Sequence, residues 1–175
     1  MLKPRSTLVL GGAASGKSIY AEGLLTECKG RFLYIATAKP TDGEMFQKVS
    51  DHRSRRGKLW TTIEEPLGLV EALERSDGSE ALILVDCLTL WLSNLMEAQM
   101  DILMETKRLV AAINEGQGRL ILVSNETGSG MVPDNALARR FRNLQGRLNQ
   151  EIAAAADEVI LITAGIPLIL KKPTV

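Results

Sequence analysis

The stretch Gly11-Gly12-Ala13-Ala14-Ser15-Gly16-Lys17-Ser18 decides the fold of this chain. The residues before it, Thr7 to Leu10, predict a short buried strand, and the segment from Lys17 to about Cys28 predicts a helix. Glycines in the loop let the backbone wrap a phosphate with its N–H groups pointing inward, and the positive end of the helix dipole adds to that attraction. Since a chance match would rarely bring both flanking elements, this order predicts a phosphate-binding loop. Lys17 is expected to reach the β and γ phosphates of a nucleoside triphosphate, and Ser18 to coordinate Mg²⁺.

Strands alternate with helices along the rest of the chain. Further strands are expected at 32–37, 60–64, 81–85, 119–124 and 158–163, and further helices at 44–55, 67–73, 88–96, 102–114 and after Pro133-Asp134. This alternation predicts an α/β fold with a mainly parallel sheet and helices on both faces, in the P-loop NTPase (RecA-like) architecture. The length of 175 residues predicts a single domain over 1–175.

Charge and composition narrow the possible partners. Lys plus Arg number 21, as do Asp plus Glu, so the formal net charge is zero and no basic field favours nucleic acid or an anionic membrane. No apolar run reaches the roughly 18 residues of a membrane span, and the first residues lack the features of a signal peptide. Cys28 and Cys87 match no metal or redox spacing and fall in apolar stretches. We therefore expect a cytoplasmic protein with reduced core cysteines.

Polar residues follow the ends of several predicted strands. Asp86 closes the strand at 81–85, where a carboxylate would help to hold Mg²⁺, although it could instead cap the helix that follows. The glycine-rich loop 125–133, which carries Glu126, follows another buried strand. Because the carboxyl ends of parallel strands share one edge of a sheet, these segments are predicted to meet the phosphate-binding loop there.

His52 is the single histidine of the chain and stands in the run Asp51-His52-Arg53-Ser54-Arg55-Arg56. A neutral imidazole can attack phosphorus and carry the transferred group covalently, and neighbouring arginines can bind phosphate oxygens. A solvated basic helix end explains the same residues. The residues alone leave these two interpretations about even.

The region after Pro133-Asp134 predicts a long amphipathic helix. Its apolar side chains recur every three or four residues, at Leu137, Phe141, Leu144, Leu148 and Ile152. Arg140, Asn143 and Arg147 share another face, which we interpret as solvated in preference to a site for an anionic ligand or a neighbouring subunit.

Taken together, these segments resemble the bifunctional adenosylcobinamide kinase/adenosylcobinamide-phosphate guanylyltransferase family of cobalamin biosynthesis. The resemblance covers nearly the whole chain, in the family's order and spacing. It rests on Gly11–Ser18, Tyr34–Thr37, Glu44-Met45, His52-Arg53 with Arg56, Trp60–Pro66, Val85–Trp91, Asn94-Leu95, Asn125–Pro133, Arg139, Phe141-Arg142, Gly146 and Asn149-Gln150. The chain departs from the family at Ala14, where relatives often carry arginine.

The resemblance implies two reactions. The first phosphorylates the aminopropanol hydroxyl of adenosylcobinamide with ATP or GTP. The second transfers GMP from GTP onto that phosphate through a histidine that matches His52, and it releases pyrophosphate. Family members are cytoplasmic trimers. The nucleotide contacts implied by position are the phosphate-binding loop, Ala36, Thr37, Ala38, Arg53, Ser54, Arg55, Arg56, Glu64 and Asp86.

Two other hypotheses remain open at this point. A simple P-loop small-molecule kinase would transfer the γ-phosphate and form no covalent enzyme, with His52 in a structural role. A nucleotide-binding switch would bind nucleotide tightly and hydrolyse it slowly. The histidine within its arginine run favours the bifunctional enzyme over both.

Overall fold

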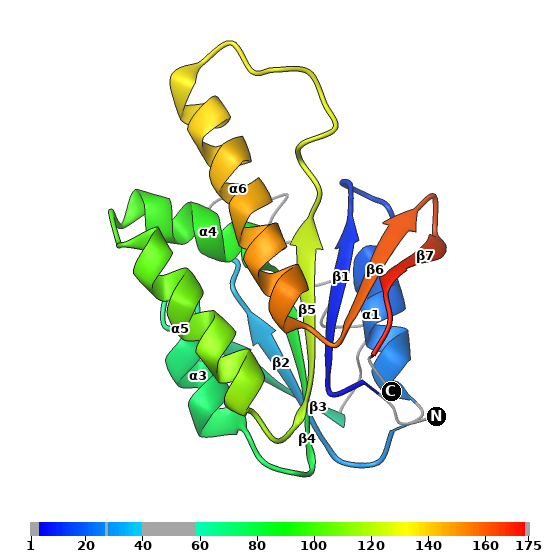
Figure 1. Ribbon diagram of the computed structural model, residues 1–175. Coiled ribbons are helices and arrows are strands. Elements are labelled where there is room, and N and C mark those ends of the chain that lie inside the picture. Colours follow the sequence, from blue (N-terminus) through cyan, green and yellow to red (C-terminus); the bar gives the residue numbers. More distant parts are fainter. Residues whose placement is uncertain (1–3, 27, 40–58, 174–175) are drawn as a thin grey trace.

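The computed structural model describes residues 4–26, 28–39 and 59–173. These residues form one seven-stranded sheet and the helices that pack on it (Figure 1). The strand order is β3-β2-β4-β5-β1-β6-β7, and every neighbouring pair is parallel except β6 and β7. The strands are β1 (Ser6–Gly11), β2 (Arg31–Ala36), β3 (Trp60–Glu64), β4 (Ala81–Asp86), β5 (Arg119–Asn125), β6 (Glu158–Thr163) and β7 (Ile166–Lys171).

Helices cover both faces of the sheet, as predicted. Among the described residues, α1 lies on one face and the other four helices on the opposite face (Figure 1). Along β5, Leu120 and Leu122 join the core beneath the four helices, whereas Ile121 and Val123 join the core beneath α1. Burial on both faces explains why the central strands are almost entirely apolar. The helices are α1 (Lys17–Thr26), α3 (Leu69–Ser76), α4 (Leu88–Glu97), α5 (Ile102–Glu115) and α6 (Ala136–Ala155).

The predicted elements are confirmed wherever the structure describes them, with small shifts at their ends. The helix expected from residue 67 begins at Leu69, and β3 is an edge strand. The helix expected at 44–55 lies outside the described residues. The apolar residues after β6 form β7, which turns back on β6 through Ala164 and Gly165 with φ angles of 51° and 79°. Such paired positive φ values are typical of a two-residue hairpin turn.

One predicted core position of α6 is wrong. Leu137 is 67% exposed, whereas Leu148 and Ile152 are buried against the sheet. The helix has 20 residues and is about 30 Å long, while the six- or seven-residue strands span about 20 Å. Its first turns therefore project beyond the strand ends, where no core lies beneath them (Figure 1). The solvated interpretation of Arg140, Asn143 and Arg147 agrees with their exposure.

Within the described ranges, no helix is both long enough and apolar enough to cross a lipid bilayer.

Candidate nucleotide site

The phosphate-binding loop connects the end of β1 to the start of α1, and it requires glycine at two positions, one for lack of space and one for its backbone conformation. A Cβ at Gly11 would lie 2.8 Å from the carbonyl oxygen of Ile162. Gly16 has φ +93°, a conformation that side chains strongly disfavour. Lys17 is the first residue of α1, and its Nζ donates a hydrogen bond to the Gly12 carbonyl oxygen at 3.0 Å. The ammonium group thus lies against the loop that is predicted to hold phosphate.

The hairpin turn between β6 and β7 supports this loop from the side. The backbone N–H of Gly165 donates to the Ser15 carbonyl oxygen at 2.9 Å. A Cβ at Gly16 would lie 3.3 Å from the Cα of Gly165, so the two segments pack closely. The sequence prediction did not include Gly165 in the site. The available signal was an Ala-Gly pair between two apolar runs, which is typical of a tight hairpin.

Asp86 ends β4 at the same edge of the sheet. The strand registers pair Asp86 with Val123, and Val123 with Val9, which comes two residues before Gly11. Since β5 lies between β4 and β1, the two strands are about 10 Å apart. The Tyr34 hydroxyl donates to Oδ2 of Asp86 at 3.1 Å. Asp86 is not the N-cap residue of α4, because Cys87 occupies that position.

The pKa of the Cys87 thiol is raised by its surroundings. Burial, together with the negative charge of Asp86, raises its pKa to about 11, while the positive charge of Lys17 acts in the opposite direction. The thiol therefore stays protonated at neutral pH and is a poor nucleophile. The register of β4, β5 and β1, and not this pKa, places Asp86 and Lys17 at the same rim of the sheet.

The predicted nucleotide-contact segment 36–38 also lies at this rim, after β2. Thr37 is fully buried, and its hydroxyl donates to the Cys87 carbonyl oxygen at 2.7 Å and accepts from the Cys87 N–H at 2.9 Å. Asn94 of α4 donates through Nδ2 to the carbonyl oxygens of Thr37 and Pro66, at 2.8 and 2.9 Å. The Thr37 side chain therefore joins the ends of β2 and β4, and Asn94 ties both to the end of β3.

Glu64 lies level with Asp86 along the sheet but far from the phosphate-binding loop. It is exposed at the end of β3, four strand positions from β1, which corresponds to about 19 Å. Glu64 and the loop therefore cannot hold the same phosphate group. The predicted residues His52, Arg53, Ser54, Arg55 and Arg56 lie outside the described residues.

The loop after β5 completes the rim on the side of β1. The Glu126 N–H donates to the Gly11 carbonyl oxygen at 3.0 Å, which fixes this loop against the start of the phosphate-binding loop. The Glu126 carboxylate folds back and accepts from the Gly128 N–H. These contacts agree with the prediction that the strand ends meet at one edge.

A phosphate-binding loop, an acidic residue on a second strand and a polar rim occur in many nucleotide-binding proteins, so geometry alone leaves the family open. Residues 7–170 match the family model described as cobinamide kinase / cobinamide phosphate guanyltransferase. The chain belongs to this family. It is therefore an enzyme of the kinase and guanyltransferase class that the family description names.

Individual members of the family align with nearly the whole chain. A bifunctional adenosylcobalamin biosynthesis protein, CobP from Pseudomonas aeruginosa, is 45% identical over 166 residues, which cover 94% of this chain and 96% of that protein. The corresponding CobU protein from Escherichia coli is 36% identical over 179 residues, covering 94% and 98%.

Solved structures of lower identity share the fold alone. An ATPase from the type III secretion system of pathogenic bacteria has a TM-score of 0.53 at 13% identity, covering 91% of this chain and 51% of that one. A protein from Pyrococcus horikoshii OT3 has a TM-score of 0.54 at 10% identity, covering 99% and 89%. The likeness to these structures and the mostly parallel sheet confirm the predicted α/β fold.

Proposed function

We propose that the enzyme phosphorylates adenosylcobinamide with ATP or GTP and then transfers GMP from GTP onto the new phosphate through His52. The observation that carries this proposal is the phosphate-binding loop, with Lys17 held against it and Asp86 at the same rim of the sheet, in a chain that aligns over 94% of its length with proteins named as bifunctional. A nucleoside triphosphate held at that loop can supply either its γ-phosphoryl group or its nucleotidyl group.

The first step is phosphoryl transfer to the substrate hydroxyl. A bond forms between the hydroxyl oxygen and the γ-phosphorus, the bond from that phosphorus to the β–γ bridging oxygen breaks, and a nucleoside diphosphate leaves. The hydroxyl proton passes to solvent. The N–H groups of residues 11–18 hold the β and γ oxygens, and Lys17 offsets the charge that develops on them.

The second step is guanylyl transfer in two displacements. An imidazole nitrogen of His52 attacks the α-phosphorus of GTP, the α–β bond breaks, and pyrophosphate leaves with its charge held at the phosphate-binding loop. An oxygen of cobinamide phosphate then attacks the same phosphorus, and the P–N bond to His52 breaks. Arg53, Arg55 and Arg56 offset the repulsion between the two polyanions. A covalent carrier thus replaces a single collision of two highly charged substrates.

Mg²⁺ is the proposed cofactor, and Ser18 and Asp86 are the residues that would hold it. Both offer the hard oxygen atoms that Mg²⁺ prefers, and both belong to the same rim. Mg²⁺ in nucleotide sites is usually bound by one or two protein oxygen atoms and takes its remaining ligands from phosphates and water. The ion would neutralise part of the charge on the β and γ oxygens.

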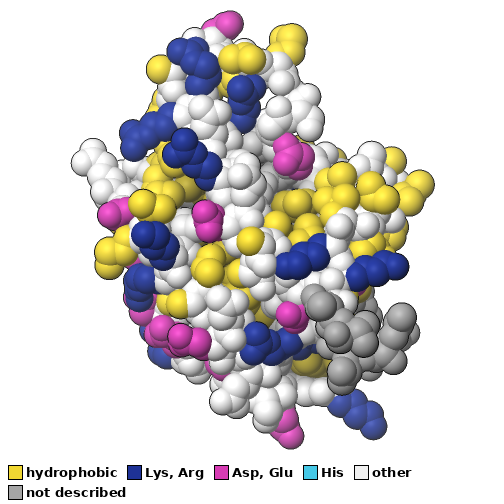
Figure 2. Space-filling model, in the orientation of Figure 1, with side chains coloured by type: hydrophobic (Ala, Val, Ile, Leu, Met, Phe, Trp, Pro, Cys, Tyr) yellow, Lys and Arg dark blue, Asp and Glu magenta, His cyan; other side chains and the backbone are white. Residues whose placement is uncertain are grey.

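We also infer that the chain forms a homo-oligomer, a trimer by its resemblance to the family. Four apolar side chains of the edge strand β7, Ile166, Leu168, Ile169 and Leu170, are between 48% and 70% exposed. Figure 2 shows hydrophobic side chains gathered on this side of the molecule. An exposed apolar surface on an edge strand supports contact with a second chain.

A charge placed on this strand tests the oligomer. We expect Leu168→Glu to reduce the mass measured by light scattering from three chains to one, because a carboxylate would be buried at the contact. Leu103→Glu is the matched control, because Leu103 is a 63%-exposed residue of α5, and it should leave the mass unchanged. A wild-type mass of one chain contradicts the inference.

Radioactive GTP tests the proposed function directly. With Mg²⁺ and GTP labelled at the α-phosphate, we expect label on the protein that is stable in base and lost in acid, as a histidine phosphoramidate would be. Cobinamide phosphate should remove the label as cobinamide-GDP forms. GTP labelled at the γ-phosphate should leave none on the protein. If protein incubated with α-labelled GTP carries no acid-labile label while phosphoryl transfer to adenosylcobinamide proceeds, the simple kinase is the correct function.

A further inference from the structure

Asn125 is the last residue of β5, the strand between the phosphate-binding loop and Asp86. The register pairs Asn125 with Gly11 on β1, at a strand spacing of about 4.8 Å. On the other side, Asp86 of β4 pairs with Val123, two residues earlier on the same strand. Asn125 therefore occupies the middle of the rim, directly beside the first residue of the loop.

The alternation of side chains places Asn125 on the face of the sheet that carries the phosphate-binding helix. Ser124 faces α6, where its hydroxyl donates to Oδ1 of Asn149 at 2.7 Å. Asn125 consequently shares the opposite face with Ile121 and Val123, whose core lies beneath α1. On β4, Leu82 and Leu84 belong to the same core, so Asp86 also lies on this face.

The Asn125 side chain has no hydrogen-bond partner among the described residues. Its Oδ1 atom is buried without a partner, and no hydrogen bond within those residues uses its amide nitrogen. The hydroxyl oxygens of Ser15, in the phosphate-binding loop, and Thr127, two residues after Asn125, are buried without partners as well. Buried polar atoms are rarely left unpaired in folded proteins, and three of them along one rim indicate that a polar ligand completes the site.

The backbone of Asn125 is, by contrast, firmly held. Its N–H donates to Oγ1 of Thr89 at 2.8 Å, and its carbonyl oxygen accepts from Nδ2 of Asn149 at 3.0 Å. Gln145 donates through Nε2 to Oγ of Ser124 and Oδ1 of Asn149, both at 2.9 Å. A fixed backbone with an unpaired amide is the arrangement expected of a preorganised ligand contact.

We propose that the Asn125 amide contacts the reacting groups in phosphoryl transfer, donating from Nδ2 to a γ-phosphoryl oxygen and accepting at Oδ1 from the attacking hydroxyl. This inference rests on the proposed kinase step. An amide can donate and accept at once, which suits a place between a phosphoryl oxygen and a hydroxyl. It adds no negative charge beside the phosphates, as a carboxylate would. The amide positions the hydroxyl and stabilises charge, and it takes no proton.

Two substitutions test the proposal, Asn125→Ala and the nearly isosteric Asn125→Asp. We expect Asn125→Ala to lower kcat for phosphoryl transfer about 100-fold, with the Kd for GTP within about threefold of wild type. Asn125→Asp should lower kcat further, because its carboxylate repels the γ-phosphoryl group. Labelling of the protein from α-labelled GTP should stay within about threefold, since that reaction does not transfer the γ-phosphate. Asn114→Ala, an exposed position near the end of α5, is the matched control and should behave as wild type.

The outcomes separate this inference from the proposed function. An unchanged kcat in both variants overturns the role of Asn125. So does an equal loss of kinase and labelling activity with a lowered melting temperature, which would make Asn125 a purely structural residue. Wild-type protein that transfers neither the phosphoryl nor the guanylyl group contradicts the proposed function itself.

Discussion

Replacement of Lys17 by alanine is expected to reduce both phosphoryl transfer and guanylylation by about 10²–10³-fold. The ammonium group lies 3.0 Å from the Gly12 carbonyl oxygen, inside the loop that would surround the phosphates. In phosphoryl transfer it offsets charge on the β and γ oxygens, and in guanylyl transfer the same oxygens leave as pyrophosphate. One cation thus serves both steps, and its loss should affect both. Rates of product formation from γ-labelled ATP and α-labelled GTP measure the two effects.

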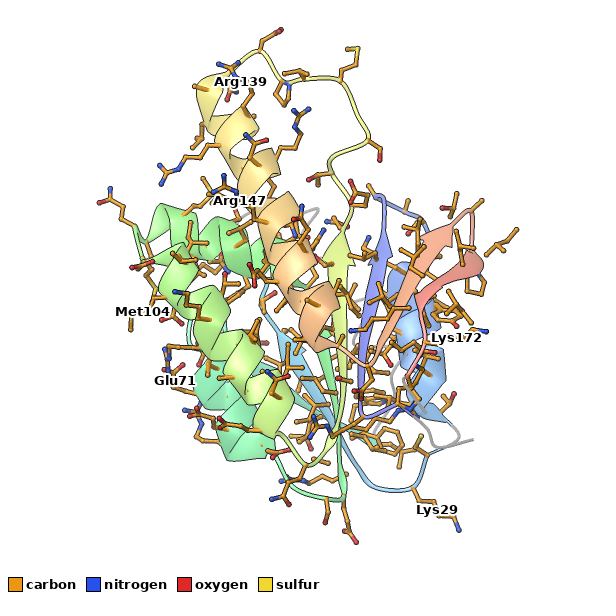
Figure 3. The ribbon with its side chains drawn as sticks, in the orientation of Figure 1. Lys29, Glu71, Met104, Arg139, Arg147 and Lys172 are labelled. Atoms are coloured by element: carbon orange, nitrogen blue, oxygen red, sulfur yellow. The ribbon has the colours of Figure 1, made fainter. Side chains whose placement is uncertain are left out.

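The matched control for this variant is Lys29→Ala. Lys29 is exposed and follows the C-terminal end of α1, so it lies at the opposite end of the strands from the phosphate-binding loop (Figure 3). Both variants should keep a melting temperature within about 2 °C of wild type, because neither removes a core contact. Full kinase turnover in Lys17→Ala would mean that the loop does not hold the transferred phosphate.

The sequence was sufficient to predict the elements of the fold because their signals are local. The loop pattern at 11–18 needs only its flanking strand and helix, and each buried strand is a short apolar run between polar segments. The rim was also predictable, since parallel strands bring their carboxyl ends to one edge. The order of strands was not, because pairing is set by contacts between segments far apart in the chain. The position of β5 between β1 and β4 is therefore known only from the structure.

Individual side chains at the site were harder to assign for the same reason. Thr37 was predicted to contact the nucleotide, but its hydroxyl makes two hydrogen bonds with Cys87, fifty residues later. Asn125 looked like part of a glycine-rich loop, and its unpaired amide is visible only when all its neighbours are placed. Leu137 fits the apolar period of α6, yet it is exposed, since periodicity identifies a face and cannot tell how far the core extends along it.

Replacement of His52 by alanine is expected to abolish the acid-labile label from α-labelled GTP and to lower GMP transfer by at least about 1,000-fold. Phosphoryl transfer from the γ-position should stay within about threefold of wild type, because the first step requires no covalent carrier. His52→Gln, which keeps a polar side chain of similar length, should give the same result. Chromatography of the labelled products with each nucleotide measures both steps on one preparation.

Comparison with Lys17→Ala is needed to interpret the activities of the His52 variants. A residue that only binds nucleotide should affect both reactions, as Lys17 does, whereas a residue that carries GMP should affect one. Loss of both activities in His52→Ala would therefore assign this histidine to nucleotide binding or to the fold. Retention of the acid-labile label would show that another side chain carries GMP. Loss of the label with kinase activity intact is the combination that a guanylylated His52 predicts, and His52 is the single histidine of the chain.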